Sequence, residues 1–171
     1  GQDDFGKYTE EILRAEGFNE FDSKSLADIY RSDSFLSHYP IVILSEKVSD
    51  PVWWKYLERY VQKGGRLISV VPSDYPESLF GIRVLKSDVV PGYIFIDTAS
   101  HEGSSLTGHR IQVHSESHPC SAGSANVVAW FRNTDGNGKK FPALVISSQG
   151  KGRTAAFLYN LPANVVLTRQ G

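Results

Sequence analysis

The chain has 171 residues, of which 40% are hydrophobic and 22% charged, and its formal net charge is −1. These values are typical of one globular domain and exclude general disorder, and a chain of this length buries a core without disulfides or metals. Its charge provides no basic field for nucleic acid, and no apolar run approaches the ~20 residues that span a bilayer. The single cysteine, Cys120, excludes an internal disulfide.

The first half of the chain alternates helix and strand patterns. In chain order it predicts a helix over 6–16, a short strand over 18–21, a short helix near 25–29, a strand over 41–44, a helix over 51–63 and a strand over 67–71. Asp50 and Pro51 are suited to start the third helix, and Gly64 to end it. The two later strands have almost no polar interruption, which is typical of parallel strands covered on both faces.

The second half is richer in strand patterns. After a short helix over 77–80, it predicts strands over 93–96, 110–113, 126–131, 143–146 and 155–159, with a hairpin turn over 135–138. The two halves together predict a flavodoxin-like three-layer α/β/α sandwich with a mostly parallel sheet and a β-rich C-terminal half. Residues 1–171 are expected to form a single domain from a longer multidomain chain.

Three segments carry a resemblance to a known family. They run from Phe5 to Phe18, from Leu57 to Val71 and from Gly150 to Leu158. Their order and spacing resemble class I glutamine-amidotransferase-like domains of the trehalose-utilisation type. The resemblance implies an amidotransferase scaffold, whose active members place a cysteine at a tight turn after the strand, supported by a histidine and a glutamate.

This sequence departs from that catalytic pattern. The turn after the strand reads Pro72-Ser73-Asp74, the segment after the last strand begins at Asn160 without a histidine, and Cys120 lies elsewhere. Without a thiolate and an activating imidazole, glutamine hydrolysis has no nucleophile. The resemblance therefore predicts a pseudoenzyme, lacking the amidotransferase triad.

The expected function follows from this loss. The chain resembles domains near the start of large secreted bacterial proteins, which implies an extracytoplasmic, carbohydrate-related setting with other domains of the same chain, or a polysaccharide, as partners. A non-catalytic module for interaction or scaffolding is the leading hypothesis. Two alternatives stay open, namely a hydrolase acting on a sugar or ester through Ser73 and Asp74, and a carbohydrate-binding module.

The expected site lies where ligands bind in open α/β sheets, beyond the carboxyl ends of the strands. Asp4, Glu46, Ser73 and Asn160 are the candidate ligand-binding residues there. Ser73 needs a base to act as a nucleophile, and none is visible at a matching position. The simpler interpretation is that Ser73 or Asp74 caps the helix over 77–80.

Histidines and tryptophans suggest no further site. Four histidines cluster between His101 and His118, but their spacing matches no familiar ligand pattern, so we expect neither a metal nor a cofactor. Trp53 and Trp130 are expected to pack in the core, and adjacent Trp53 and Trp54 point about 100° apart on a helix, so at most one would be exposed.

Overall fold

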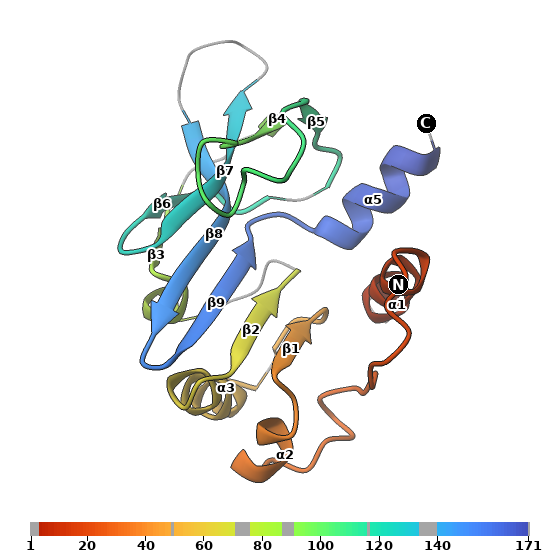
Figure 1. Cartoon of the computed structure of the whole chain (residues 1–171), viewed down its shortest axis with the longest axis vertical. Coiled ribbons are helices and arrows are strands. Elements are labelled where there is room, and N and C mark those ends of the chain that lie inside the picture. The colour runs from red at the N-terminus through yellow and green to blue at the C-terminus, as the bar shows by residue number, and fades with distance from the viewer. Residues whose placement is uncertain are drawn as a thin grey trace.

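The computed structural model describes residues 4–48, 50–70, 76–86, 91–115, 117–133 and 140–170 (Figure 1). The helices are α1 (Asp4–Ala15), α2 (Asp33–Ser37), α3 (Val52–Gln62), α4 (Glu77–Phe80) and α5 (Leu161–Gln170). The strands are β1 (Ile41–Leu44), β2 (Arg66–Ser69), β3 (Ile82–Val84), β4 (Pro91–Ile96), β5 (Ile111–Gln112), β6 (Cys120–Ala122), β7 (Asn126–Asn133), β8 (Lys140–Gln149) and β9 (Gly152–Phe157).

The centre of the molecule is one mixed sheet. Its seven strands follow the order β1-β2-β9-β8-β7-β4-β5, and β3 pairs with β6 in a separate small sheet. Among the described strands, only β1, β2 and β9 run parallel to one another, whereas β9, β8, β7, β4 and β5 pair antiparallel in turn. The expected flavodoxin-like sandwich with a mostly parallel sheet was therefore wrong, although the β-rich second half is confirmed.

The reason lies in the connections between strands. A parallel pair needs a crossover of a dozen or more residues, and α3 supplies one between β1 and β2. Within the described ranges no such helix separates the later strands, and β7, β8 and β9 pair with their chain neighbours in antiparallel fashion. The apolar pattern of 41–44 and 67–71 indicated parallel strands correctly, but it applied to one half of the sheet alone.

Most local predictions in the first half are confirmed. Gly17 follows α1 with a φ of +90°, and Gly64 follows α3 with a φ of +118°. Asp50 Oδ1 accepts a hydrogen bond of 2.9 Å from Val52 N at the start of α3. The expected strand over 18–21 is irregular instead, and the expected helix near Ser25 is a single turn.

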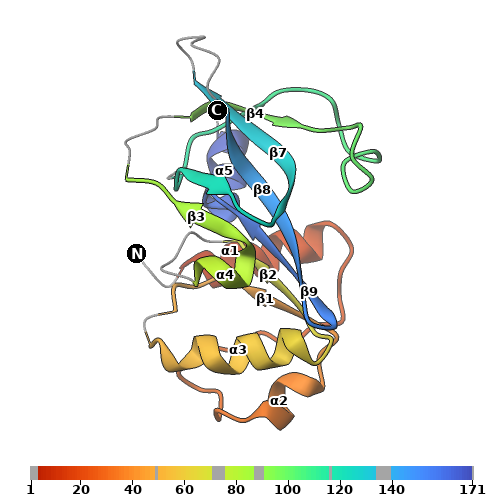
Figure 2. The same cartoon turned by 90° about the vertical axis from the view of Figure 1, so that its left-hand side faces the viewer.

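The two faces of the sheet are covered by different elements. The helices α3 and α4 and the small β3–β6 sheet lie on one face, and α1 and α5, which contact each other, lie on the opposite side (Figure 2). Trp53 and Trp54 of α3 are both buried, and Trp54 packs edge-on against Phe80 with ring centroids 6.3 Å apart. Trp130 is half-buried, so it is less enclosed than expected.

Burial differs sharply between those faces. Leu67, Val145 and Ala156, which point toward α3 and α4, are fully buried. Their neighbours along the strands, including Ile68 and Ala155, point the other way and are half-buried. The hydrophobic core therefore sits between the sheet and the α3–α4 layer.

Candidate functional site

Polar side chains at the carboxyl ends of the parallel strands form hydrogen bonds that hold the backbone. Glu46, just after β1, accepts a hydrogen bond of 2.7 Å from Leu26 N through Oε1, which holds the segment between α1 and α2. Asn160, after β9, is 6% exposed and accepts a 3.0 Å hydrogen bond from Ala163 N through Oδ1. It therefore caps α5, as short polar side chains commonly do.

The other predicted site residues are placed only in part. Asp4 is the first residue of α1, and that helix begins at the carboxyl end of β1, because a Cβ on Gly6 would lie 3.9 Å from Ser45 Oγ. Ser73 and Asp74 lie outside the described residues. The structure thus brings Asp4, Glu46 and Asn160 to the expected edge of the sheet, and commits the last two to backbone hydrogen bonds.

The only sulfur lies away from this edge. Cys120 is fully buried on β6, where its strand pairs with β3. Burial, followed by the charge of Glu77, raises the pKa of its thiol to about 11, so at neutral pH the thiol is protonated. A buried neutral thiol is a poor nucleophile.

The segment from His101 to His118, which holds four histidines, attaches β5 to the rest of the fold. His114 N donates a 2.7 Å hydrogen bond to Oδ1 of Asn164, a side chain only 3% exposed on α5. The Nδ2 of Asn164 donates to Gln112 O at 3.2 Å, and His118 N donates to Leu158 O at 2.9 Å. In the part of the chain that the structure describes, no histidine, cysteine or carboxylate groups gather as a metal site.

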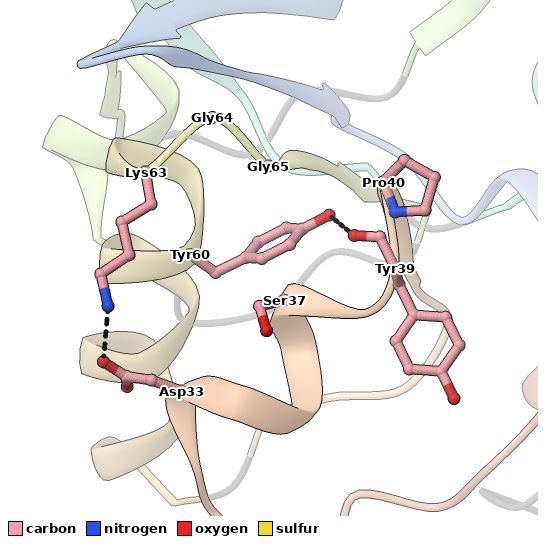
Figure 3. A pocket seen from close by; sticks show the side chains of 8 residues that line it. All are labelled: Asp33, Ser37, Tyr39, Pro40, Tyr60, Lys63, Gly64 and Gly65. Atoms are coloured by element: carbon pink, nitrogen blue, oxygen red, sulfur yellow. Dashed lines mark hydrogen bonds and ion pairs between the residues drawn. The ribbon is translucent and has the colours of Figure 1, made fainter.

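A hollow lies at the opposite, amino end of the parallel strands (Figure 3). It measures about 230 Å³ and is lined by residues of α2, α3 and the loops that precede β1 and β2, namely Asp33, Ser37, Tyr39, Pro40, Tyr60, Lys63, Gly64 and Gly65. The ring of Tyr60 forms one wall. Its hydroxyl donates to Tyr39 O at 2.8 Å and accepts from Arg66 N at 3.3 Å.

The charges of this hollow are already paired. Asp33 accepts hydrogen bonds from Arg59 Nη2 at 2.9 Å and from Lys63 Nζ at 3.0 Å. These two bonds, that from Arg59 first, hold the pKa of the Asp33 carboxyl below its usual value. Burial raises the pKa of Tyr60, so its hydroxyl stays protonated. The hollow offers a ring and a carboxylate that is paired with two cations, and the described side chains that line it include no activated nucleophile.

A second hollow adjoins the first at Gly64. It also measures about 230 Å³ and is more basic, with a lining of Gly64, Arg66, Ser148, Gly150, Lys151, Gly152 and Arg153. Sequence reasoning missed both hollows because it expected the site at the carboxyl ends of the strands. The signal in the sequence is the Lys-Gly-Arg run at 151–153, which places two cations beside a glycine.

Comparison with known proteins supports the fold. The chain superposes on the cytoplasmic protein STM1381 from Salmonella typhimurium LT2 with a TM-score of 0.68 and 16% identity, over 89% of this chain and 74% of that one. A ThuA-like protein from Bacteroides uniformis matches 95% of this chain and 79% of its own, with a TM-score of 0.59 and 12% identity. The chain shares its fold with ThuA-like proteins.

The same fold also occurs inside a much larger enzyme. A β-galactosidase from Bacillus circulans sp. alkalophilus matches 76% of this chain with a TM-score of 0.59 and 20% identity. The match covers 21% of the β-galactosidase, so this chain corresponds to about a fifth of that protein. No family model matches the sequence, and no curated protein does either. At these identities the likeness extends to the fold alone.

Proposed function

We propose that the chain is a non-catalytic module of amidotransferase-like fold that docks against another domain of a larger, polysaccharide-related protein. The observation that carries the proposal is the unequal burial of the two sheet faces. On the α3–α4 side, Leu67, Val145 and Ala156 have no exposed surface. On the α1–α5 side, Ile68 and Ile146 are only half-buried, and Ile41 is 46% exposed.

The apolar part of this sheet face favours a protein partner. Ile41 and Ile43 of β1, Ile68 of β2 and Ile146 of β8 lie on the same face by strand register and alternation. Exposed apolar patches of several neighbouring side chains mark interaction surfaces more often than isolated ones do. A docked domain would bury these side chains and gain roughly 25 cal/mol for each Å² of apolar surface removed from water.

Two further observations support the non-catalytic role and the carbohydrate-related setting in turn. The thiol of Cys120 is enclosed and protonated, which leaves no sulfur for amide cleavage. The β-galactosidase carries a region of this fold as about a fifth of its chain, which supports a place beside a carbohydrate-active domain. An extracytoplasmic location is part of the same proposal, and fractionation of cells that produce the full-length protein would test it.

Hydrogen exchange tests the docking role directly. Amides of β1 and β2 should exchange at least ~10-fold more slowly in the full-length gene product than in the 171-residue chain, while amides of β7 keep the same rates. Ile41→Lys should abolish that difference. Val84→Lys is the matched control, because Val84 is 53% exposed on β3, on the other side of the sheet, and it should leave the difference intact. Equal rates in both proteins would overturn the docking proposal.

Activity assays separate the alternatives. Ammonia release from glutamine should stay at background, and release that disappears in Cys120→Ser would contradict a non-catalytic module. Ester or glycoside cleavage lost in Ser73→Ala would instead support the hydrolase. Saturable binding of a neutral polysaccharide by the 171-residue chain would favour the carbohydrate-binding module.

A further inference from the structure

A row of polar side chains crosses three strands at the amino end of the parallel sheet. Arg66 on β2 and Arg153 on β9 are direct partners in the parallel register, and Ser148 on β8 is the antiparallel partner of Arg153. Partners in register project from the same face of a sheet, so the two guanidinium groups and the hydroxyl emerge side by side. All three side chains are exposed.

These cations line the basic hollow of about 230 Å³ together with Lys151, and no carboxylate among the described residues lines it. The ion pairs recorded among the described residues involve Arg31, Arg59 and Lys63 instead. Three positive charges therefore share one concave surface without a recorded counter-charge. Adjacent like charges across a sheet are unfavourable, and an anion between them would relieve the repulsion.

The backbone around the hollow is closely packed. A Cβ on Gly152 would lie 2.1 Å from Val61 O and 2.3 Å from Gly65 O, so a larger residue does not fit. Lys151 N donates to Gln62 O at 3.1 Å, and Arg153 N donates to Gly65 O at 3.3 Å. These bonds tie the β8–β9 turn to the end of α3 and to β2. The backbone that carries the cations is therefore held before any ligand arrives, which reduces the entropic cost of binding.

We propose that this hollow binds an oxyanion group, such as a phosphate, sulfate or carboxylate, between Arg66 and Arg153. Arginine forks pair with such groups through two parallel N–H···O bonds, and Ser148 adds a hydroxyl donor. The volume is below the ~300–1,000 Å³ of drug-sized sites, which suits one charged group and a small attached moiety. The site lies on the same sheet face as the docking patch, since Arg66 is the register partner of Ile41, and it differs from that patch in its charged residues and its small ligand.

Titrations followed by NMR at constant ionic strength test this site in the 171-residue chain. Inorganic phosphate and glucuronate serve as probes, with glucose as the neutral control. We expect saturable shifts at the amides of 151–153 and at Arg66, and none with glucose. Saturation by both phosphate and glucuronate supports a site for any oxyanion. Saturation by only one of them supports the site and identifies whether it takes a phosphate or a carboxylate.

Variants establish whether the two arginines act together. Arg66→Gln and Arg153→Gln should each raise the Kd about tenfold, the loss expected for one charge-assisted pair. Arg83→Gln is the matched control, because Arg83 is an exposed arginine on β3 outside the hollow, and its Kd should equal that of the unchanged chain. Two results would overturn the oxyanion site. They are chemical-shift changes that rise linearly with the concentration of every salt, and chemical-shift changes that are reduced equally in all three variants. Hydrogen exchange at β1 and β2 stays the independent test of docking.

Discussion

Gly65→Ala should destabilise the protein by acting on one neighbour, Tyr60. The added Cβ would lie 2.2 Å from Tyr60 Cζ and 2.4 Å from both Cε atoms. The ring cannot move without loss, because Tyr60 is only 7% exposed and its hydroxyl bonds Tyr39 O and Arg66 N. The φ of Gly65 is not in the left-handed region, so the backbone accepts alanine and the cost is steric.

The magnitude follows from two contributions. Overpacking a filled site costs about 1–3 kcal/mol, and displacing the ring leaves buried polar groups unpaired at about 1–3 kcal/mol. A ring that moves away relieves part of the steric overlap but loses its hydrogen bonds, so the two costs are not fully additive. We therefore expect the free energy of unfolding to fall by about 2–4 kcal/mol. Urea unfolding followed by tryptophan fluorescence, with the slope compared between variants, measures it.

A double-mutant cycle isolates the contact between Gly65 and Tyr60. In a Tyr60→Ala background, Gly65→Ala should cost less than about 0.5 kcal/mol, because the methyl then enters vacated space. Gly64→Ala is the matched control, since its cost comes from a φ of +118° and its Cβ would meet only Lys151 Cβ at 3.9 Å. Its effect should be the same in both backgrounds. An equal cost of Gly65→Ala with and without the ring would refute the steric explanation.

Three further predictions concern other groups. The pKa of Asp33 is lowered by hydrogen bonds from its cationic partners, so its small contribution to stability is present above pH 3.8 and is lost as the pH falls through the lowered value; an NMR titration of the Asp33 carboxyl measures the pKa, and urea unfolding at several pH values, with Asp33→Asn as the reference, measures the contribution. The pKa of Cys120 is raised to about 11, so the free energy of unfolding is independent of this thiol below pH 9 and falls as the pH rises from 9 toward 11. Iodoacetamide at pH 8 should label the native chain about 100-fold more slowly than the urea-unfolded chain, and equal rates would contradict the burial of Cys120. Asn164→Ala should cost about 1–3 kcal/mol by leaving the amide of His114 unpaired, which faster hydrogen exchange at that amide would reveal.

The site shows how far sequence reasoning reached. The positions of Glu46 and Asn160 at the carboxyl edge of the sheet follow from the strands that precede them, and both are found there. Their hydrogen-bond partners, Leu26 and Ala163, could not be predicted, because a side chain's partner depends on which loop or helix packs beside it. The pairing of Arg66 with Arg153 was likewise hidden, since 86 residues separate them in the chain and only the register of β2 on β9 brings them together.

Local patterns determined the elements whose signals are contained in a short stretch of chain. Asp50 and Gly64 mark the ends of α3 through caps that act within one turn, and unbroken apolar runs indicated β1 and β2. The helix α5 was missed, although Asn160 caps it, because its strand-like apolar residues give little helical periodicity.

The tertiary structure alone decided the direction of the strands and the exposure of their faces. A strand such as β8 presents the same alternation to a parallel or an antiparallel neighbour, so its pairing depends on the short connections to β7 and β9. In the same way, Ile68 and Leu67 are equally apolar in sequence. One is half-buried and the other fully buried because α3 packs tightly on one face of the sheet, while α1 and α5 cover the other face only in part.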